Sequence, residues 1–176
     1  GLLPKDSWRI IQYLIKQYEI QPELIYAAGI CHQPEAKDWL LKILKTHKEF
    51  NLAILEALRC WGGSLSIEFL KKILNEPEQT KKLAGLELLQ FKAYQLCDND
   101  LLELTKELLN DFRDPVVIAT IKILRRRDDP EICNHIVTVA QKGSNATARA
   151  ALMALGGIGT KNSYEALTKL SKQLPV

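Results

Sequence analysis

The stretch Arg149 to Leu170, RAALMALGGIGTKNSYEALTKL, decides the fold of this sequence. Its first half is rich in alanine and leucine, which favour helices. The pair Gly156-Gly157 follows, and glycine ends helices well because it adopts left-handed backbone conformations at little cost. The remaining residues again place apolar side chains at helical spacing. The stretch therefore predicts a helix, a short turn that begins at Gly156, and a second helix.

The first half of this unit occurs three more times upstream. Each copy has an alanine followed by aliphatic residues two and five positions later, and the steps between the alanines are 31, 35 and 31 residues. The four alanines are Ala53, Ala84, Ala119 and Ala150, and their aliphatic companions are Leu55, Leu58, Leu86, Leu89, Ile121, Leu124, Leu152 and Leu155. Periods of this length are typical of stacked helical units. We expect the alanines to let neighbouring helices approach closely and the aliphatic residues to fill the core.

The second helix of each unit keeps the register of the first. The positions 17 and 20 residues after each alanine are all apolar, namely Leu70, Ile73, Leu101, Leu104, Ile136, Val139, Leu167 and Leu170. One step is longer, because Ala119 follows Leu104 by 15 residues whereas Ala84 follows Ile73 by 11. The four extra residues make about one helical turn, so we expect a one-turn lengthening that keeps the buried face in phase.

The turns inside the other units carry residues that suit turns. Gly62-Gly63 is expected to end one first helix as Gly156-Gly157 ends the last one. In the two middle units, residues 98–100 (Asp-Asn-Asp) and 128–130 (Asp-Asp-Pro) are expected to form the turn through side-chain hydrogen bonds and proline.

The N-terminal part of the chain predicts a capping helix and one further hairpin. Residues 1–20 contain apolar residues at helical spacing and precede the repeats, so we interpret them as a cap helix. Pro22 opens a short helix, and a second helix is expected over residues 35–47. The predicted fold class is therefore all-α, with one domain over residues 1–176 in which residues 21–176 form about five helical hairpins. Whether the sequence is a fragment of a longer chain stays open.

The last unit resembles the HEAT repeat, and more closely the subclass named after phycobilisome lyases. That pattern reads roughly A-x-x-A-L-G-x-I-G followed by an A-x-x-x-L helix, and the residues that match it are Ala151, Ala154, Leu155, Gly156, Ile158, Gly159, Ala166 and Leu170. The resemblance implies a right-handed α-α superhelix, a HEAT-like solenoid with first helices on its convex side and second helices on its concave side. Family members mostly bind other proteins, while a minority handle bilin chromophores or recognise damaged DNA.

Charge and cysteine usage narrow the classes of partner. The chain has 24 Lys and Arg against 21 Asp and Glu, a net charge of +3, which disfavours nucleic acid as the partner. No run of about 18 apolar residues is present, so no membrane span is expected. The four cysteines, Cys31, Cys60, Cys97 and Cys133, form no C-x-x-C pair and are expected to be buried free thiols in a reducing compartment. We therefore expect a cytoplasmic monomer, with a tether outside this sequence left open.

No catalytic, cofactor-binding or metal-binding residue is predicted. The sequence contains no phosphate-binding glycine loop, no H-E-x-x-H and no G-x-S-x-G. His32, His47 and His135 fall in different parts of the predicted stack, so they form no metal or acid-base group. Residues 125–127 (Arg-Arg-Arg) end a predicted helix, where they either complement its dipole or contact a phosphate or an acidic peptide. The tryptophans are expected in the core.

The exposed side of the second helices is the best candidate for a binding surface. Its predicted partner-binding residues are Lys42, Lys45, Lys71, Lys72, Lys106, His135, Thr138, Lys169 and Lys172. These lysines suit an acidic partner, but glutamates on the same helices can also pair with them and leave a solvated mixed-charge face. We therefore predict a non-enzymatic scaffold that binds a protein partner on its concave face. The alternatives are a phycobilin lyase or related bilin-handling enzyme, and a DNA-binding HEAT-like protein.

Overall fold

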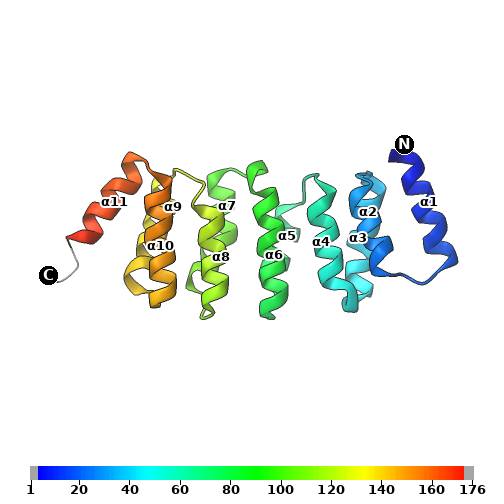
Figure 1. The fold of residues 1–176 in the computed structure, drawn as a ribbon, viewed down its shortest axis with the longest axis horizontal. Helices are drawn as coiled ribbons and strands as arrows, with labels where there is room; N and C mark the ends of the chain where they lie inside the picture. Colours follow the sequence, from blue (N-terminus) through cyan, green and yellow to red (C-terminus); the bar gives the residue numbers. More distant parts are fainter. Residues whose placement is uncertain (1–3, 173–176) are drawn as a thin grey trace. The chain divides into compact units, whose positions relative to one another are not determined.

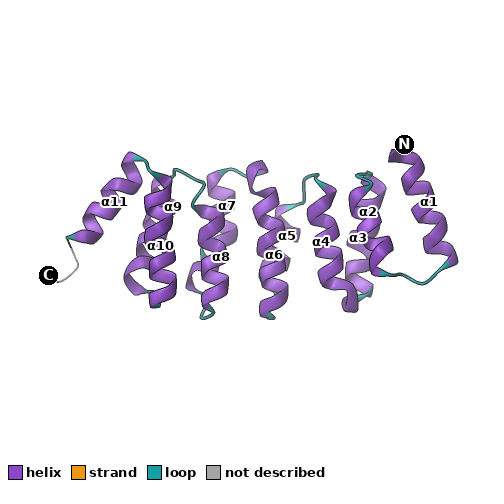
Figure 2. Ribbon diagram, viewed as in Figure 1, coloured by secondary structure: helices purple, strands orange, loops and turns teal. Residues whose placement is uncertain are grey.

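The computed structural model describes residues 4–172, with only the backbone described for residues 4 and 5. Every regular element in this range is a helix, which confirms the all-α class (Figures 1 and 2). The elements are α1 (Pro4–Gln17), α2 (Pro22–Ile30), α3 (Pro34–Thr46), η1 (Lys48–Phe50), α4 (Asn51–Trp61), α5 (Ile67–Leu74), α6 (Gln79–Lys92), η2 (Ala93–Gln95), α7 (Asp98–Thr105), η3 (Glu107–Asn110), α8 (Asp114–Leu124), α9 (Pro130–Lys142), α10 (Asn145–Ile158) and α11 (Lys161–Ser171), where η marks a 3-10 helix.

The chain folds into two compact units, which we describe separately. The first contains Gly1–Ser66 and Glu87–Lys92, and the second contains Ile67–Leu86 and Ala93–Val176. In the first unit α2 packs against α1, α3 and α4, and α3 packs against α4. Gly29 in α2 and Ala57 in α4 are both fully buried, and a Cβ atom on Gly29 would lie 2.5 Å from the carbonyl oxygen of Ala57. The two helices therefore touch through small residues.

In the second unit the packing contacts join alternate helices as well as consecutive ones. The helices α5 and α7 are in contact, as are α8 and α10, and α9 and α11. The helix α10 also packs against α9 and α11. Contact between alternate helices is the arrangement expected when hairpins follow one another and bury a shared core.

Turns one repeat apart are joined by hydrogen bonds. The guanidinium of Arg127 donates to Asp98 Oδ1 at 2.9 Å and to the carbonyl oxygens of Ala93 and Leu96 at 2.5 and 3.0 Å. In the next repeat the Thr160 hydroxyl donates to Asp128 Oδ1 at 2.7 Å. Asp98 precedes Arg127 by 29 residues and Asp128 precedes Thr160 by 32. These bonds therefore link equivalent turns of consecutive hairpins.

The predicted core is largely confirmed, with two corrections. Of the aliphatic residues named above, all are buried except Leu167, which is half-buried, and Leu152, which is 43% exposed. The prediction that Leu152 belongs to the core was wrong, because this side chain is exposed on α10. The four repeated alanines, Ala53, Ala84, Ala119 and Ala150, are only half-buried. The centre of the buried face of each first helix lies just after its alanine. The small residues of the first helices that are fully buried lie one or four positions later, for example Gly85 and Ala57.

The turn predictions need correction in two of four units. Gly62 ends α4 with a φ of 85°, as predicted. In the last unit α10 continues through Gly156 and Gly157, and Gly159 supplies the left-handed residue with a φ of 66°. Asp129 caps α9 as predicted, whereas Asp98 begins α7, which Cys97 caps by accepting from the Asp100 backbone N–H.

The long step between repeats is visible as η3. Its four residues follow α7 as a separate 3-10 turn rather than as a longer α-helix. Leu108 and Leu109 in this turn are 4% and 5% exposed, so the insertion adds to the core as well as to the surface. The extra turn was predicted, but its geometry was not.

The cysteines are free, but only two of them are buried. Cys31 and Cys133 are buried, and burial raises the pKa of the Cys133 thiol. Cys60 and Cys97 are exposed, so the prediction of four buried thiols was wrong for this pair. Trp8 lies in the core and contacts Trp39, with ring centroids 6.1 Å apart. None of the helices in residues 4–172 is both long and apolar enough to cross a bilayer.

Candidate functional site

A cleft of about 570 Å³ lies in the second unit, where η3 meets α8, α9 and the start of α10. Its size falls within the range of pockets that hold a small molecule or a few side chains of a partner. The residues that line it are Leu109, Asn110, Asp111, Phe112, Asp114, Val117, His135, Thr138, Val139, Lys142, Gly143, Ser144 and Thr147. The four-residue insertion therefore contributes one wall of the cleft.

The cleft combines an apolar floor with an exposed aromatic residue. Leu109, Val117 and Val139 are each at most 6% exposed. Phe112, in contrast, is 88% exposed, and its ring carries the guanidinium of Arg113 at 4.8 Å from the ring centroid. Removing an exposed aromatic ring from water is favourable, so a partner that covers the Phe112 ring would gain binding free energy.

One face of α9 supplies the polar side of the cleft. His135, Thr138 and Lys142 are spaced three and four residues apart, so they lie on the same side of the helix. The Thr138 hydroxyl donates to the carbonyl oxygen of Asn134 at 3.0 Å, which leaves its methyl group and both oxygen lone pairs for a ligand. His135 is half-buried and Thr138 is exposed. The structure thus brings together two of the predicted partner-binding residues.

The end of the cleft is a rigid turn between α9 and α10. The Ser144 hydroxyl donates to Asp114 Oδ2 at 2.8 Å and accepts from the backbone N–H of Thr147 at 3.2 Å, so it caps α10. A Cβ atom on Gly143 would lie 2.3 Å from Thr147 Oγ1 and 2.6 Å from the carbonyl oxygen of Val139. The close packing at Gly143 fixes the position of the α10 N-terminus against α9.

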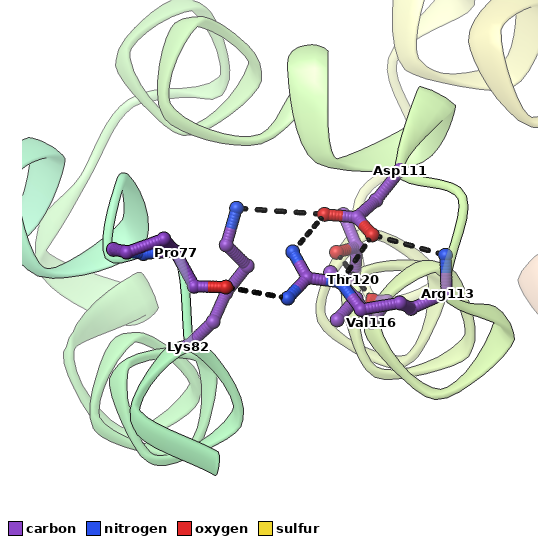
Figure 3. A network of polar contacts seen from close by, with 6 residues as sticks. All are labelled: Pro77, Lys82, Asp111, Arg113, Val116 and Thr120. Carbon is purple, nitrogen blue, oxygen red and sulfur yellow. Dashed lines mark hydrogen bonds and ion pairs between the residues drawn. The ribbon is translucent and has the colours of Figure 1, made fainter. Parts of the chain in front are cut away.

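A buried carboxylate anchors the opposite end. Figure 3 shows that Lys82 and Arg113 converge on the carboxylate of Asp111, whose side chain is only 7% exposed. Arg113 donates from Nε and Nη2 at 2.7 Å each and from its backbone N–H at 3.0 Å, and Lys82 Nζ lies 3.4 Å away. Arg113 also donates to the carbonyl oxygen of Pro77 at 2.8 Å. The network therefore ties the η3–α8 connection to the turn one repeat earlier.

The electrostatics of Asp111 indicate a structural role. The Arg113 guanidinium lowers the pKa of this carboxyl from 3.8 to about 2, with smaller help from the charge of Lys82. Burial opposes this effect but does not overcome it. Because Asp111 is ionised and fully engaged at neutral pH, it offers a ligand neither a proton nor an unpaired charge.

The predicted lysines of α5 and Lys106, which directly follows α7, belong to a mixed-charge surface. Lys106 Nζ lies 2.5 Å from Glu103 Oε1, and this hydrogen bond lowers the pKa of Glu103 and raises that of Lys106. Lys71 adds to the lowering of the Glu103 pKa, and Glu131 to the raising of the Lys106 pKa. Cations and carboxylates therefore alternate from α5 to α9. Lys72 is exposed.

The remaining predicted residues lie elsewhere. Lys169 and Lys172 line an open depression of about 630 Å³ along α11, together with Tyr164, which is 72% exposed. Lys42 and Lys45 are exposed on α3, in the first unit. The structure therefore does not gather the nine predicted residues into one site.

The basic run after α8 divides between two environments. Arg125 and Arg126 are exposed, whereas Arg127 is half-buried and held by Asp98 and two carbonyl oxygens. Arg127 therefore serves the contact between repeats. Within residues 4–172, no three His, Cys, Asp or Glu side chains lie together in a way that could hold a metal ion.

Sequence reasoning missed Phe112 and Lys142, and it missed the cleft itself. The sequence did contain one signal for the cleft, namely the insertion revealed by the long step between Leu104 and Ala119. The insertion places Phe112 on a connecting segment, and such segments often carry binding residues. No protein-family model and no curated protein matches this sequence.

Proposed function

We propose that this chain is a helical-repeat module that binds a protein partner through the cleft of its second unit. The observation that carries the proposal is the cleft built by η3, where an exposed Phe112 stands beside an apolar floor and the His135-Thr138 face of α9. An extended segment of a partner would bury the Phe112 ring and place one apolar side chain on the floor. Its polar groups would meet Thr138 and Lys142.

We further propose that the hairpins are of the HEAT type and stack in the right-handed sense of that family. The contacts between alternate helices and the hydrogen bonds between turns 29 and 32 residues apart support this interpretation. The second helices would then form the inner surface, which includes the α9 side of the cleft. Catalysis is not part of this proposal, since binding alone accounts for the exposed aromatic residue and the apolar floor.

The test is recovery of a partner with wild-type chain and then measurement of its affinity for single variants. Thr138→Arg would fill the cleft with a long charged side chain, and Phe112→Ala would remove the aromatic edge. Each change should weaken binding at least about tenfold, which corresponds to about 1.4 kcal/mol. Lys122→Glu, on the exposed side of α8, is the matched control. Unchanged affinity for both cleft variants would reject the cleft as the binding site.

The predicted acidic character of the partner needs its own variant. The double change Lys71→Glu and Lys72→Glu reverses the charge on α5 while leaving the cleft intact. A partner with acidic segments should then bind more weakly, and the loss should shrink at high salt. If the double variant binds the partner with the same affinity as wild type, the partner contacts the cleft and not the lysines of α5.

A further inference from the structure

The Phe112 ring at the cleft of the second unit is supported from one side. The guanidinium of Arg113 lies over it, 4.8 Å from the ring centroid, and the Arg113 side chain is only 14% exposed. Figure 3 shows that this guanidinium is anchored, since it donates twice to the Asp111 carboxylate at 2.7 Å and once to the carbonyl oxygen of Pro77 at 2.8 Å. The structure therefore holds an aromatic ring in water against a fixed support.

The other face of the Phe112 ring is open. The residue remains 88% exposed although the guanidinium covers one face of its ring. A ring that already rests against a fixed group loses little conformational freedom when a partner covers it, so the entropic cost of binding is low. Aromatic rings also stack favourably on one another. The open face of Phe112 therefore suits an apolar side chain, above all an aromatic one.

The charged groups that line the cleft are unequally satisfied. The carboxylate of Asp111 is bound by Arg113. Asp114 Oδ2 accepts from the Ser144 hydroxyl at 2.8 Å, and the charge of Asp114 complements the N-terminus of α8, which begins at this residue. Lys142, in contrast, is exposed, and its ammonium group forms no ion pair with any described residue. The charge that the cleft offers to a ligand is therefore positive.

His135 and Lys142 lie at the two ends of the α9 face that lines the cleft. They are seven residues apart, which corresponds to about 10.5 Å along the helix axis. An extended chain covers this distance with about three residues. The His135 ring forms no hydrogen bond with a described residue, so its N–H is available to a carbonyl oxygen of such a chain. The face therefore has the length of a short extended segment whose carboxylate reaches Lys142.

We propose that the cleft recognises an extended acidic-apolar segment of a partner protein, in which a carboxylate binds Lys142 and an apolar side chain covers the open face of Phe112. This inference rests on the proposed binding function, and it adds the sign of the charge and the kind of side chain that the partner presents. A basic residue at the same point would be repelled by Lys142, while both carboxylates of the cleft already accept hydrogen bonds. A small inorganic anion would leave the Phe112 ring and the apolar floor in water, so the cleft fits a protein segment.

The experiment selects ligands for the full chain from a displayed library of random linear peptides. Peptides that also bind the Thr138→Arg variant are discarded, because a long charged side chain fills the cleft in that variant. The remaining peptides should carry an aspartate or glutamate within about three residues of an aromatic or large aliphatic residue. This spacing follows from the length of the α9 face between His135 and Lys142.

Charge exchange between Lys142 and a selected peptide tests the ion pair. In fluorescence anisotropy the acidic peptide should bind Lys142→Glu at least about tenfold more weakly than wild type. The same peptide with its acidic residue replaced by lysine should bind Lys142→Glu more tightly than wild type, a reversal that loss of stability would not produce. Lys122→Glu, on the exposed side of α8, is the matched control and should bind the acidic peptide as wild type does.

The outcomes separate this inference from the proposed function. If every selected peptide also binds Thr138→Arg, the cleft is not a binding site and both are rejected. If the cleft-dependent peptides lack an acidic residue, or if the acidic peptide binds Lys142→Glu as tightly as wild type, the inference is refuted and the proposed function stands. Equal affinity of the acidic peptide for Phe112→Ala and wild type would also refute the inference.

Discussion

Replacing Asp111 by asparagine should destabilise the second unit in a way that depends on pH. The carboxylate accepts three hydrogen bonds from Arg113 and faces Lys82 at 3.4 Å, and asparagine would leave both cations without a counter-charge. The pKa of Asp111 falls from 3.8 to about 2 on folding. A lowering of this size corresponds to about 2 kcal/mol of stability at neutral pH.

The sign follows from the direction of the pKa change. Because the folded pKa lies below the unfolded one, the contribution of Asp111 is fully present above the unfolded pKa of 3.8 and is lost as pH falls toward about 2. At pH 7 the Asp111→Asn variant should therefore unfold with about 2 kcal/mol less free energy than wild type. Near pH 2 the difference should shrink below about 0.5 kcal/mol.

Urea unfolding followed by circular dichroism at pH 7, 5, 3 and 2 measures this difference directly. Glu103→Gln is the matched control, because it removes an exposed carboxylate that also pairs with a lysine, and it should change stability by less than about 0.5 kcal/mol. A difference for Asp111→Asn that stays constant from pH 5 to pH 2 would refute the reasoning. So would a difference at pH 7 no larger than that of the control.

Three further predictions concern packing, buried charge and the contact between repeats. Gly29→Ala should destabilise the chain by about 1 to 3 kcal/mol, because the new Cβ atom would lie 2.5 Å from the carbonyl oxygen of Ala57. Gly156→Ala should instead stabilise the chain by about 0.5 to 1 kcal/mol, because open space surrounds this position in α10. Thermal unfolding of both variants measures these two changes. Burial lowers the pKa of Lys92 and penalises its charged form, so the stability of the wild-type chain should increase as pH rises toward 10.5. Lys92→Met should be more stable than wild type at pH 7 and should lack this increase. Urea unfolding midpoints at pH 7 and pH 10 measure both effects. Arg127→Met should lower the free energy of unfolding by about 2 kcal/mol, because three hydrogen-bond acceptors lose their donor. Amide hydrogen exchange should become faster in the turn that begins at Ala93. Unchanged exchange in this turn would contradict the structural role of Arg127.

The repeat frame carried most of the fold information. Aliphatic residues at fixed offsets from Ala53, Ala84 and Ala119 predicted the buried faces correctly, because a helix that packs on two neighbours must repeat its apolar residues at the helical period. The alanines themselves were misplaced, since a frame chosen from the identity of one residue does not locate the centre of the buried stripe. Close approach occurs instead at Gly29 and Gly85, which the pattern did not single out.

The candidate site was harder to predict than the fold. A four-residue insertion can lengthen a helix or add a separate turn, and the choice depends on how Leu108 and Leu109 pack rather than on their spacing. In the structure the insertion is a separate turn, and its residues Leu109 and Asn110 line the cleft beside α9. Similarly, Gly156 and Gly157 continue α10 because Gly159 is available as a left-handed cap two residues later. The burial of Lys92 left no signal at all, because a lysine in the last turn of a helix is ordinary in sequence.

Site-specific photo-crosslinking to the partner tests the central claim most directly. A benzophenone side chain at position 138 would sit at the cleft, and the same group at position 122 would sit on the exposed side of α8. Binding at the cleft predicts a covalent adduct with the partner from position 138 and none from position 122. An adduct from position 122 alone would contradict the account.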